Sequence, residues 1–216
     1  MINNDTHIVF DLDDTLYKEI DFVKSAYIFI NNYLKISVGL DLSTQIDMCI
    51  NNNINFFDFI NSKIITQKKL SIEKYLELYR FHFPTLSLPD DTKQFLNELM
   101  TRKIEFSIIT DGRSISQRNK IRSLGIYDKA QNIIISEETG FEKPDLHNFK
   151  LVENLNINKK YIYIADNTSK DFIAPNALNW DTICLVNNGQ NIHKQNFDLD
   201  DKFMPKNKIY NLLDLI

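Results

Sequence analysis

Two aspartates, Asp11 and Asp13, stand at the end of the apolar segment His7–Leu12. Side chains alternate along a β-strand, so a strand here would project both carboxylates to the same side. Two like charges this close repel each other, and burying both is costly unless a cation or a proton compensates them. Such a pair suits metal binding or acid–base chemistry. An isolated Asp-Xaa-Asp is also common in turns, where the aspartates cap the next segment.

Two further segments carry groups that suit phosphate binding. Thr110, Asp111 and Gly112 follow an apolar run and precede a helix-like stretch. A hydroxyl group and flexible backbone at a helix N-terminus make a suitable phosphate cradle, although Asp-Gly is also an ordinary turn. Lys143 stands just before Pro144, which can open a helix. A single lysine in a loop is usually a solvated charge, so neither segment is decisive alone.

A second pair of aspartates, Asp166 and Asp171, follows the apolar run Tyr161–Ala165. At this spacing the pair could bind a hard cation or cap a helix. Each of the four polar segments stands at the carboxyl end of an expected strand. Open parallel sheets bind ligands along that edge, so the four segments together predict one convergent site.

The chain from about residue 104 onward alternates short β-branched runs with polar segments that are long enough for helices. The expected strands are Ile104–Thr110, Asn132–Ser136, Tyr161–Ala165 and Thr182–Val186. The expected helices between them are Ser114–Leu124, Asp145–Asn156 and Ser169–Leu178. With His7–Leu12 as a buried first strand, this alternation predicts an α/β fold with a doubly wound parallel sheet. Residues 207–216 are expected to form a short amphipathic helix against the core.

The segment between Leu16 and Pro89 has a different pattern, which predicts three or four helices. Its apolar residues at helical spacing are Phe22, Ala26, Phe29, Ile30 and Tyr33, then Phe56, Phe59, Ile60 and Ile64. A further helix, Ile72–Phe81, begins after Ser71, a good N-cap residue. We therefore expect a core domain of residues 1–16 and 90–216, with residues 17–89 inserted as a helical cap subdomain.

The composition indicates a globular protein without a strongly basic surface. Of the 216 residues 43% are hydrophobic and 25% charged, and the net charge of −4 gives no reason to expect nucleic-acid binding. The first ten residues lack the features of a signal peptide, and no apolar run approaches the roughly 18 residues of a membrane span. Cys49 and Cys184 are far apart, which favours a reducing compartment. We predict a cytoplasmic protein with no nucleic-acid or membrane partner, and the oligomeric state stays open.

The polar segments, taken in order, resemble the four motifs of the haloacid dehalogenase-like hydrolase superfamily, in particular its phosphatase branch. The matching residues are Asp11-Leu12-Asp13-Asp14-Thr15, Thr110-Asp111-Gly112, Lys143-Pro144-Asp145 and Asp166-Asn167 with Asp171. The resemblance extends from residue 8 to about residue 187, and the helical block is similar to the C1-type cap of that superfamily. The chain departs from the usual pattern at Asp111, where asparagine is common, and at Ala165, where glycine is usual.

This resemblance implies a role for each charged residue of the motifs. Asp11 would attack phosphorus and form an aspartyl-phosphate, and Asp13 would act as general acid and then as general base. Thr110 and the backbone N–H groups near Asp111 and Gly112 would bind the phosphoryl group. Lys143 would offset negative charge on that group and on Asp11.

The resemblance also implies a magnesium cofactor. Asp166, one oxygen of Asp11 and the backbone carbonyl of Asp13 would hold Mg²⁺, and Asp171 would support the site. The expected activity is hydrolysis of a small phosphate monoester, either a sugar or polyol phosphate or a nucleoside monophosphate.

Several alternatives stay open at this point. Asp13 argues against a dehalogenase, whereas a phosphomutase and a catalytically silent binding module retain the same residues. The pathway is equally open, because a similarity to proteins of bacterial surface polysaccharides is only an association. Side chains that could contact the leaving group are those of Tyr17, Lys18, Tyr79, Arg80 and Arg113.

Overall fold

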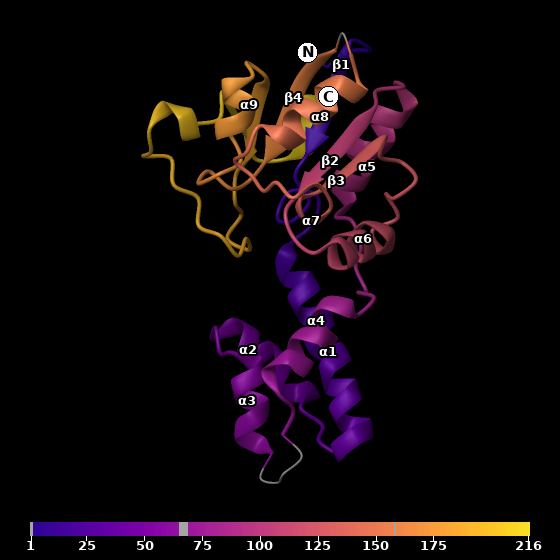
Figure 1. Cartoon of the computed structure of the whole chain (residues 1–216), viewed down its shortest axis with the longest axis vertical. Helices are drawn as coiled ribbons and strands as arrows, with labels where there is room; N and C mark the ends of the chain where they lie inside the picture. The colour runs from indigo at the N-terminus through magenta and orange to yellow at the C-terminus, as the bar shows by residue number, and fades with distance from the viewer. Residues whose placement is uncertain (1, 65–68, 158) are drawn as a thin grey trace.

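A parallel β-sheet forms the centre of the molecule, for which a computed structural model describes residues 2–64, 69–157 and 159–216. Its six strands lie in the order β3-β2-β1-β4-β5-β6 (Figure 1). They are β1 (Thr6–Phe10), β2 (Phe106–Thr110), β3 (Asn132–Ile135), β4 (Lys160–Ala165), β5 (Asp181–Leu185) and β6 (Asn207–Ile209). The chain extends the sheet in one direction from β1 to β3 and in the other from β4 to β6. The strand order therefore reverses between β1 and β4, which is where such sheets bind ligands.

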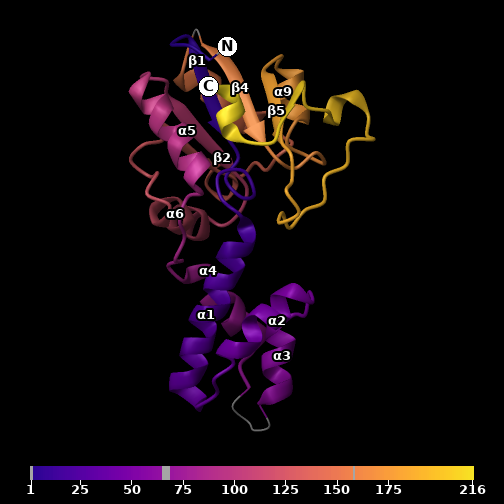
Figure 2. The same ribbon diagram turned by 180° about the vertical axis from the view of Figure 1, so that it is seen from behind.

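Helices cover both faces of this sheet, so the predicted doubly wound α/β fold is confirmed (Figure 2). One face packs against α5 (Asp90–Thr101), α6 (Ser114–Ser123) and the short η3 (Leu212–Leu215). The other face packs against α8 (His147–Leu155) and α9 (Ile173–Ala177). The remaining short helices of this region are α7 (Ser136–Thr139) and η2 (Asp201–Phe203).

A separate group of helices follows β1 and lies beyond the carboxyl edge of the sheet (Figures 1 and 2). We call it the α1–α4 group. Its elements are α1 (Glu19–Val38), η1 (Ser43–Gln45), α2 (Ile46–Asn51), α3 (Phe56–Lys63) and α4 (Ile72–Phe81). The group has its own hydrophobic cluster, to which Ile30, Phe56, Ile60 and Tyr75 contribute fully buried side chains. Phe29, expected on the buried face of its helix, is instead 42% exposed.

The longest helix, α1, connects the sheet edge to the rest of the α1–α4 group. Its 20 residues span about 30 Å at the usual helical rise. It begins at Glu19, whose backbone N–H donates to Oδ1 of Asp14 at 3.0 Å. It ends at Gly39, whose φ of 74° lies in the left-handed region that glycine adopts without strain. In the described ranges neither this helix nor any other is long and apolar enough to cross a membrane.

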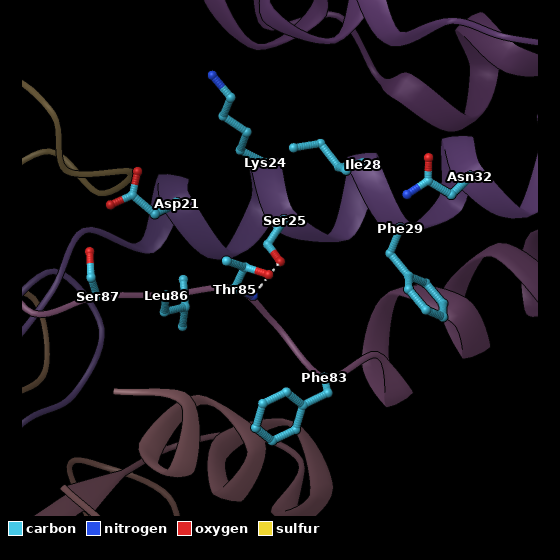
Figure 3. Close-up of a pocket in the computed structure, with 10 residues that line it drawn as sticks. All are labelled: Asp21, Lys24, Ser25, Ile28, Phe29, Asn32, Phe83, Thr85, Leu86 and Ser87. Atoms are coloured by element: carbon cyan, nitrogen blue, oxygen red, sulfur yellow. Dashed lines mark hydrogen bonds between the residues drawn. The ribbon is translucent and has the colours of Figure 1, made fainter. Parts of the chain in front are cut away.

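A cavity of about 430 Å³ lies where the chain returns from the α1–α4 group to the sheet (Figure 3). One wall is α1 and the other is the extended segment 83–87. The two walls are linked by a hydrogen bond of 2.9 Å, which Thr85 N–H donates to the hydroxyl of Ser25. None of the residues that we predicted to be catalytic lines this cavity.

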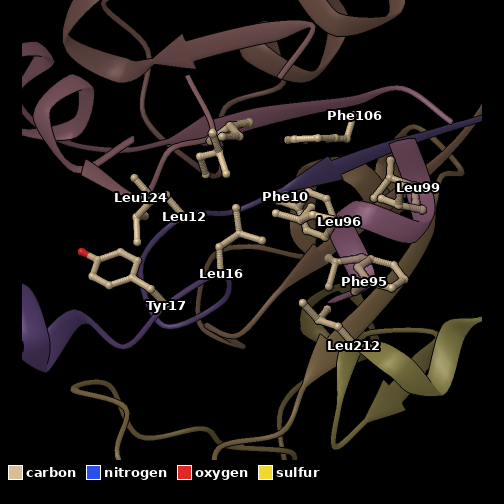
Figure 4. Close-up of a cluster of buried hydrophobic side chains, with 14 of the residues drawn as sticks. Phe10, Leu12, Leu16, Tyr17, Phe95, Leu96, Leu99, Phe106, Leu124 and Leu212 are labelled. Atoms are coloured by element: carbon tan, nitrogen blue, oxygen red, sulfur yellow. The ribbon is translucent and has the colours of Figure 1, made fainter. Parts of the chain in front are cut away.

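Alternating side chains of β1 pack into two hydrophobic clusters, one on each face of the sheet. Ile8 and Phe10 lie in the cluster shown in Figure 4, where the ring of Phe10 meets those of Phe95 and Phe106 edge to face. Val9 points to the opposite face and packs in the second cluster with Phe149. Because β1 is buried on both faces, the backbone that leads into Asp11 is held firmly from both sides.

The end of the chain differs from the prediction. Residues 207–216 form the sixth strand and the short helix η3 instead of one amphipathic helix. The strand forms because its backbone pairs with β5, and Val186 N–H also donates to the carbonyl of Ile209 at 2.8 Å. Two expected helices also begin later than predicted, at His147 and Ile173.

Candidate active site

The strand register brings the predicted residues to one edge of the sheet. Phe10 lies opposite Ile164 in the ladder, and Asp11 N–H donates to the Ile164 carbonyl at 2.9 Å. Asp11 and Asp166 thus leave neighbouring strands at nearly the same height, on either side of the point where the strand order reverses. A cavity of about 170 Å³ opens there. The predicted residues that line it are Asp11, Asp13, Thr110, Asp111, Lys143 and Asp166.

Lys143 is buried between two of the predicted carboxylates. Its Nζ lies 2.8 Å from Oδ1 of Asp11 and 2.8 Å from Oδ1 of Asp171, and it donates to the hydroxyl of Tyr163 at 3.2 Å. Burial opposes the charge of this lysine, but Asp11 and Asp171 outweigh burial and raise its pKa well above the usual value. Lys143 is therefore a fixed positive charge beside Asp11.

One lysine does not compensate the acidic groups that meet here. One carboxylate oxygen from each of Asp11, Asp166 and Asp171 lies within 4.8 Å of the others. Burial, opposed in part by Lys143, raises the pKa of Asp11 to about 7. Burial together with the charges of Asp11 and Asp171 raises the pKa of Asp166 to about 8. Two of these three buried carboxyl groups, Asp11 and Asp166, therefore resist ionisation, and the set of three is one that a hard divalent cation would stabilise.

Asp13 has different surroundings, although it is only two residues away from Asp11. Its carboxylate accepts hydrogen bonds from Lys120 Nζ at 2.8 and 2.9 Å, from Gln117 Nε2 at 2.9 Å and from the hydroxyl of Tyr17. Burial alone would raise the pKa of Asp13, but the charge and hydrogen bond of Lys120, with the hydrogen bonds from Tyr17 and Gln117, together outweigh burial and lower the pKa. The side chain of Asp13 lies outside the acidic cluster and is held as a carboxylate by these three donors.

Lys120 and Gln117 were not predicted from the sequence. They lie about one turn apart on α6, Lys120 in its last turn, and both side chains are buried. Polar residues on such a helix normally face solvent, so their types alone gave no signal. The available signal was position, because the helix begins directly after Thr110-Asp111-Gly112. Gln117 Nε2 also donates to Oγ1 of Thr110 at 2.6 Å, which leaves the hydroxyl proton of Thr110 available to another acceptor.

The unusual aspartate of the second segment, Asp111, is compensated by the protein. Its Oδ2 lies 2.6 Å from Nζ of Lys170, and its Oδ1 accepts from the backbone N–H of Lys143 at 3.1 Å. Gly112 does not line the cavity, and its N–H donates to the hydroxyl of Ser136 at 2.9 Å. Gly112 has a φ of 132°, a backbone conformation that a residue with a side chain rarely adopts.

The segment between β5 and β6 forms another part of the site that was not predicted. Asn191 Nδ2 donates to Oδ2 of Asp166 at 2.9 Å, and Asn191 Oδ1 accepts from Lys18 Nζ at 2.6 Å. Ile192 N–H donates to Oδ2 of Asp14 at 2.8 Å, and His193 reaches the cavity. Irregular segments follow no periodic pattern, so the sequence did not indicate this wall.

The residues that we expected near a leaving group lie in different places, and none of the five lines the cavity. The hydroxyl of Tyr17 donates to Asp13, and Nζ of Lys18 donates to Asn191. Arg113 pairs with Glu137 at 2.6 Å on the surface. Tyr79 packs its ring edge to face against Phe22 in the α1–α4 group. The backbone carbonyl of Arg80 accepts a hydrogen bond from Ser116 Oγ at 2.9 Å.

These features agree with a comparison of the chain with protein families. Residues 8–185 match the family described as haloacid dehalogenase-like hydrolase. The chain belongs to this family. The resemblance noted in the sequence is thereby confirmed, since the match contains all four polar segments.

Relatives of this chain carry phosphatase names. A glyceraldehyde 3-phosphate phosphatase from Methanocaldococcus jannaschii is 28% identical over 194 residues, which is 83% of this chain and 84% of the relative. A ribulose-1,5-bisphosphate 5-phosphatase from Halopiger xanaduensis is 30% identical over 100 residues, which is 45% of this chain and 42% of the relative.

Solved structures show the same fold at lower identity. A magnesium-bound HAD hydrolase from Bacillus subtilis superposes with a TM-score of 0.64. The superposition covers 97% of this chain and 96% of the Bacillus subtilis chain. The two sequences are only 18% identical, so this likeness concerns the fold alone.

Proposed function

We propose that this phosphoric monoester hydrolase is a Mg²⁺-dependent phosphatase that hydrolyses a small sugar or polyol phosphate through an aspartyl-phosphate at Asp11. The relatives named above are phosphatases of small phosphorylated sugars, which supports the proposed substrate class. The observation that carries the mechanism is the position of Asp11. Its carboxylate belongs to the acidic cluster and lies 2.8 Å from the fixed charge of Lys143, at the end of a buried strand.

Asp11 would attack the phosphorus atom of the ester, and the bond to the leaving oxygen would break as the bond to Asp11 forms. The hydroxyl of Thr110 would donate to one oxygen of the transferring group, because Gln117 already donates to Thr110. Lys143 would balance the charge that Asp11 shares with that group. Phosphoryl transfer depends mainly on such positioning and charge stabilisation.

Asp13 would move the protons of both steps. In the first step it protonates the leaving oxygen, and in the second it takes a proton from the water that attacks the aspartyl-phosphate. The donors Lys120, Gln117 and Tyr17 favour its carboxylate form, which is the form the second step requires. The first step requires Asp13 in its protonated form. The proton weakens the hydrogen bonds that Lys120 donates to Asp13, and it then passes to the leaving oxygen.

Asp11, Asp166 and the backbone carbonyl of Asp13 would hold Mg²⁺, and Asp171 would support them. Carboxylate and carbonyl oxygens suit this cation, and the raised pKa values of Asp11 and Asp166 indicate a need for positive charge here. When bound, Mg²⁺ supplies charge that offsets the phosphate and the attacking carboxylate. Residues 17–89, which contain the α1–α4 group, are the proposed cap subdomain over this site.

The direct test is phosphate release from a panel of sugar, polyol and nucleoside phosphates, with Mg²⁺ and with EDTA. We expect release that requires Mg²⁺ and is abolished in Asp11→Asn, because an amide does not form the acyl-phosphate. Asp90→Asn, an exposed residue at the start of α5, serves as the matched control. Full activity of Asp11→Asn would refute the mechanism. Exchange of phosphate between two sugar phosphates without release would indicate a phosphomutase, and no turnover a silent binding module.

A further inference from the structure

Glu19 connects the α1–α4 group to the candidate active site. It is the first residue of α1 and lies half-buried at the point where this helix leaves the sheet edge. It lines the same cavity as Asp11, Asp13 and Lys143. Within the described residues no other member of the α1–α4 group lines that cavity. A leaving group that extends from the phosphate toward this group of helices therefore meets Glu19 first.

The carboxylate of Glu19 has no hydrogen-bond or ion-pair partner among the described residues, whereas its backbone N–H is bound to Asp14. The charged groups that act on its pKa are Asp13, Lys120, Asp14 and Asp11. Burial first, and Asp13 second, raise the pKa of Glu19 to about 7. Because no described residue binds either oxygen, the ionised carboxylate can accept hydrogen bonds from a bound molecule.

The cations around the cavity are already paired with protein carboxylates. Lys143 lies between Asp11 and Asp171, Lys170 binds Asp111, and Lys120 binds Asp13. The imidazole of His193, which is exposed, is the remaining basic group on the cavity wall within the described residues. An anionic substituent next to the phosphate would thus approach Glu19 without an unpaired lysine or arginine on the described cavity wall to compensate it. A neutral hydroxyl group would instead find an acceptor there.

Resting on the proposed function, we infer that Glu19 determines which leaving groups the site accepts. Its carboxylate accepts hydrogen bonds from the hydroxyls of a neutral, polyol-type leaving group. The same carboxylate repels esters that carry a second anion, such as a carboxylate, close to the phosphate. Glu19 thus combines an attractive contact for one class of ester with a repulsive contact against another.

A matched pair of substrates tests this inference. Glycerol 3-phosphate and 3-phosphoglycerate have the same three-carbon length and the same phosphate position, and differ by a hydroxymethyl group in place of a carboxylate. We expect the wild-type kcat/KM to favour glycerol 3-phosphate by about tenfold or more, as repulsion between two partly desolvated carboxylates predicts. Glu19→Gln should reduce this preference by about tenfold, mainly through faster hydrolysis of 3-phosphoglycerate.

Two further variants make the result interpretable. Glu73→Gln changes an exposed glutamate in the first turn of α4 and should keep the wild-type preference. Glu19→Asp keeps the negative charge and should still discriminate against 3-phosphoglycerate, and Glu19→Ala, which also removes the charge, replaces Glu19→Gln as the test if that variant does not fold. A wild-type preference for 3-phosphoglycerate, or an unchanged preference in Glu19→Gln, would overturn the inference and leave the phosphatase proposal standing. Absence of Mg²⁺-dependent hydrolysis with every ester would instead defeat the proposed function.

Discussion

Two buried lysines give the two aspartates of the first segment different properties. Lys143 lies beside Asp11, where burial still dominates and raises the aspartate pKa to about 7. Lys120 lies beside Asp13, where its charge and the hydrogen bonds from Lys120, Tyr17 and Gln117 together outweigh burial and lower the aspartate pKa. Two carboxyl groups whose surroundings shift their pKa values in opposite directions commonly have different chemical roles. This contrast supports separate roles for Asp11 as nucleophile and Asp13 as acid and base.

The ion pair of Lys120 and Asp13 is expected to contribute to stability, and Asp13 to catalysis. Lys120→Met removes the cation from a largely buried carboxylate, so we expect a loss of about 3–5 kcal/mol in the free energy of unfolding. Asp13→Asn should lower turnover by about 10²–10⁴-fold, the usual contribution of general acid–base catalysis. The double variant should be more stable than Lys120→Met, because it no longer contains an unpaired buried charge. Chemical denaturation and steady-state kinetics measure these effects.

Lys93→Met provides the control, because Lys93 is exposed on α5 and the same change there should leave stability nearly unaltered. A Lys120→Met protein as stable as the wild type would show that the ion pair does not hold Asp13. Wild-type turnover in Asp13→Asn would show that the proton-transfer role belongs to another residue.

Among the elements, the parallel strands were the part that the sequence predicted best. Apolar runs marked β1, β2 and β4, and the polar residues at their carboxyl ends meet because neighbouring parallel strands end at one edge. The donors from α6 and from the segment after β5 were not predictable in the same way. The rotation of α6 about its own axis decides whether Lys120 faces solvent or Asp13. Hydrophobic periodicity does not reveal this rotation, because α6 is mostly polar.

The segment between β5 and β6 is expected to support metal binding. Asn191 belongs to this segment and donates to Asp166, a proposed metal ligand. Partners that orient a ligand typically contribute 10- to 100-fold to metal affinity. Asn191→Ala should therefore weaken Mg²⁺ binding by about that factor, measured by calorimetric titration of the full chain. Asn188→Ala, a change at an exposed residue of the same segment, should bind Mg²⁺ like the wild type. Equal affinities in both variants would exclude this role for Asn191.

The molecule as a whole places a helical group beyond the carboxyl edge of an α/β sheet, where the candidate active site lies, and α1 joins the two (Figures 1 and 2). The ring of Phe22 on α1 lies 4.3 Å from Nζ of Lys120, so the lysine that binds Asp13 also contacts the α1–α4 group. The sequence predicted a separate helical block from its change of period. It did not predict where the block lies, because contacts such as Phe22 with Lys120 join residues almost a hundred positions apart.

Trapping of the intermediate tests covalent catalysis at Asp11 most directly. The wild-type protein is mixed with Mg²⁺ and glycerol 3-phosphate, quenched in acid and reduced with borohydride, which converts an aspartyl-phosphate to homoserine. Peptide mass spectrometry then locates the reduced residue. We predict homoserine at position 11 in the wild type and none in Asp11→Asn. Homoserine at another aspartate, or steady phosphate release with an unmodified Asp11 at every quench time, would contradict the account.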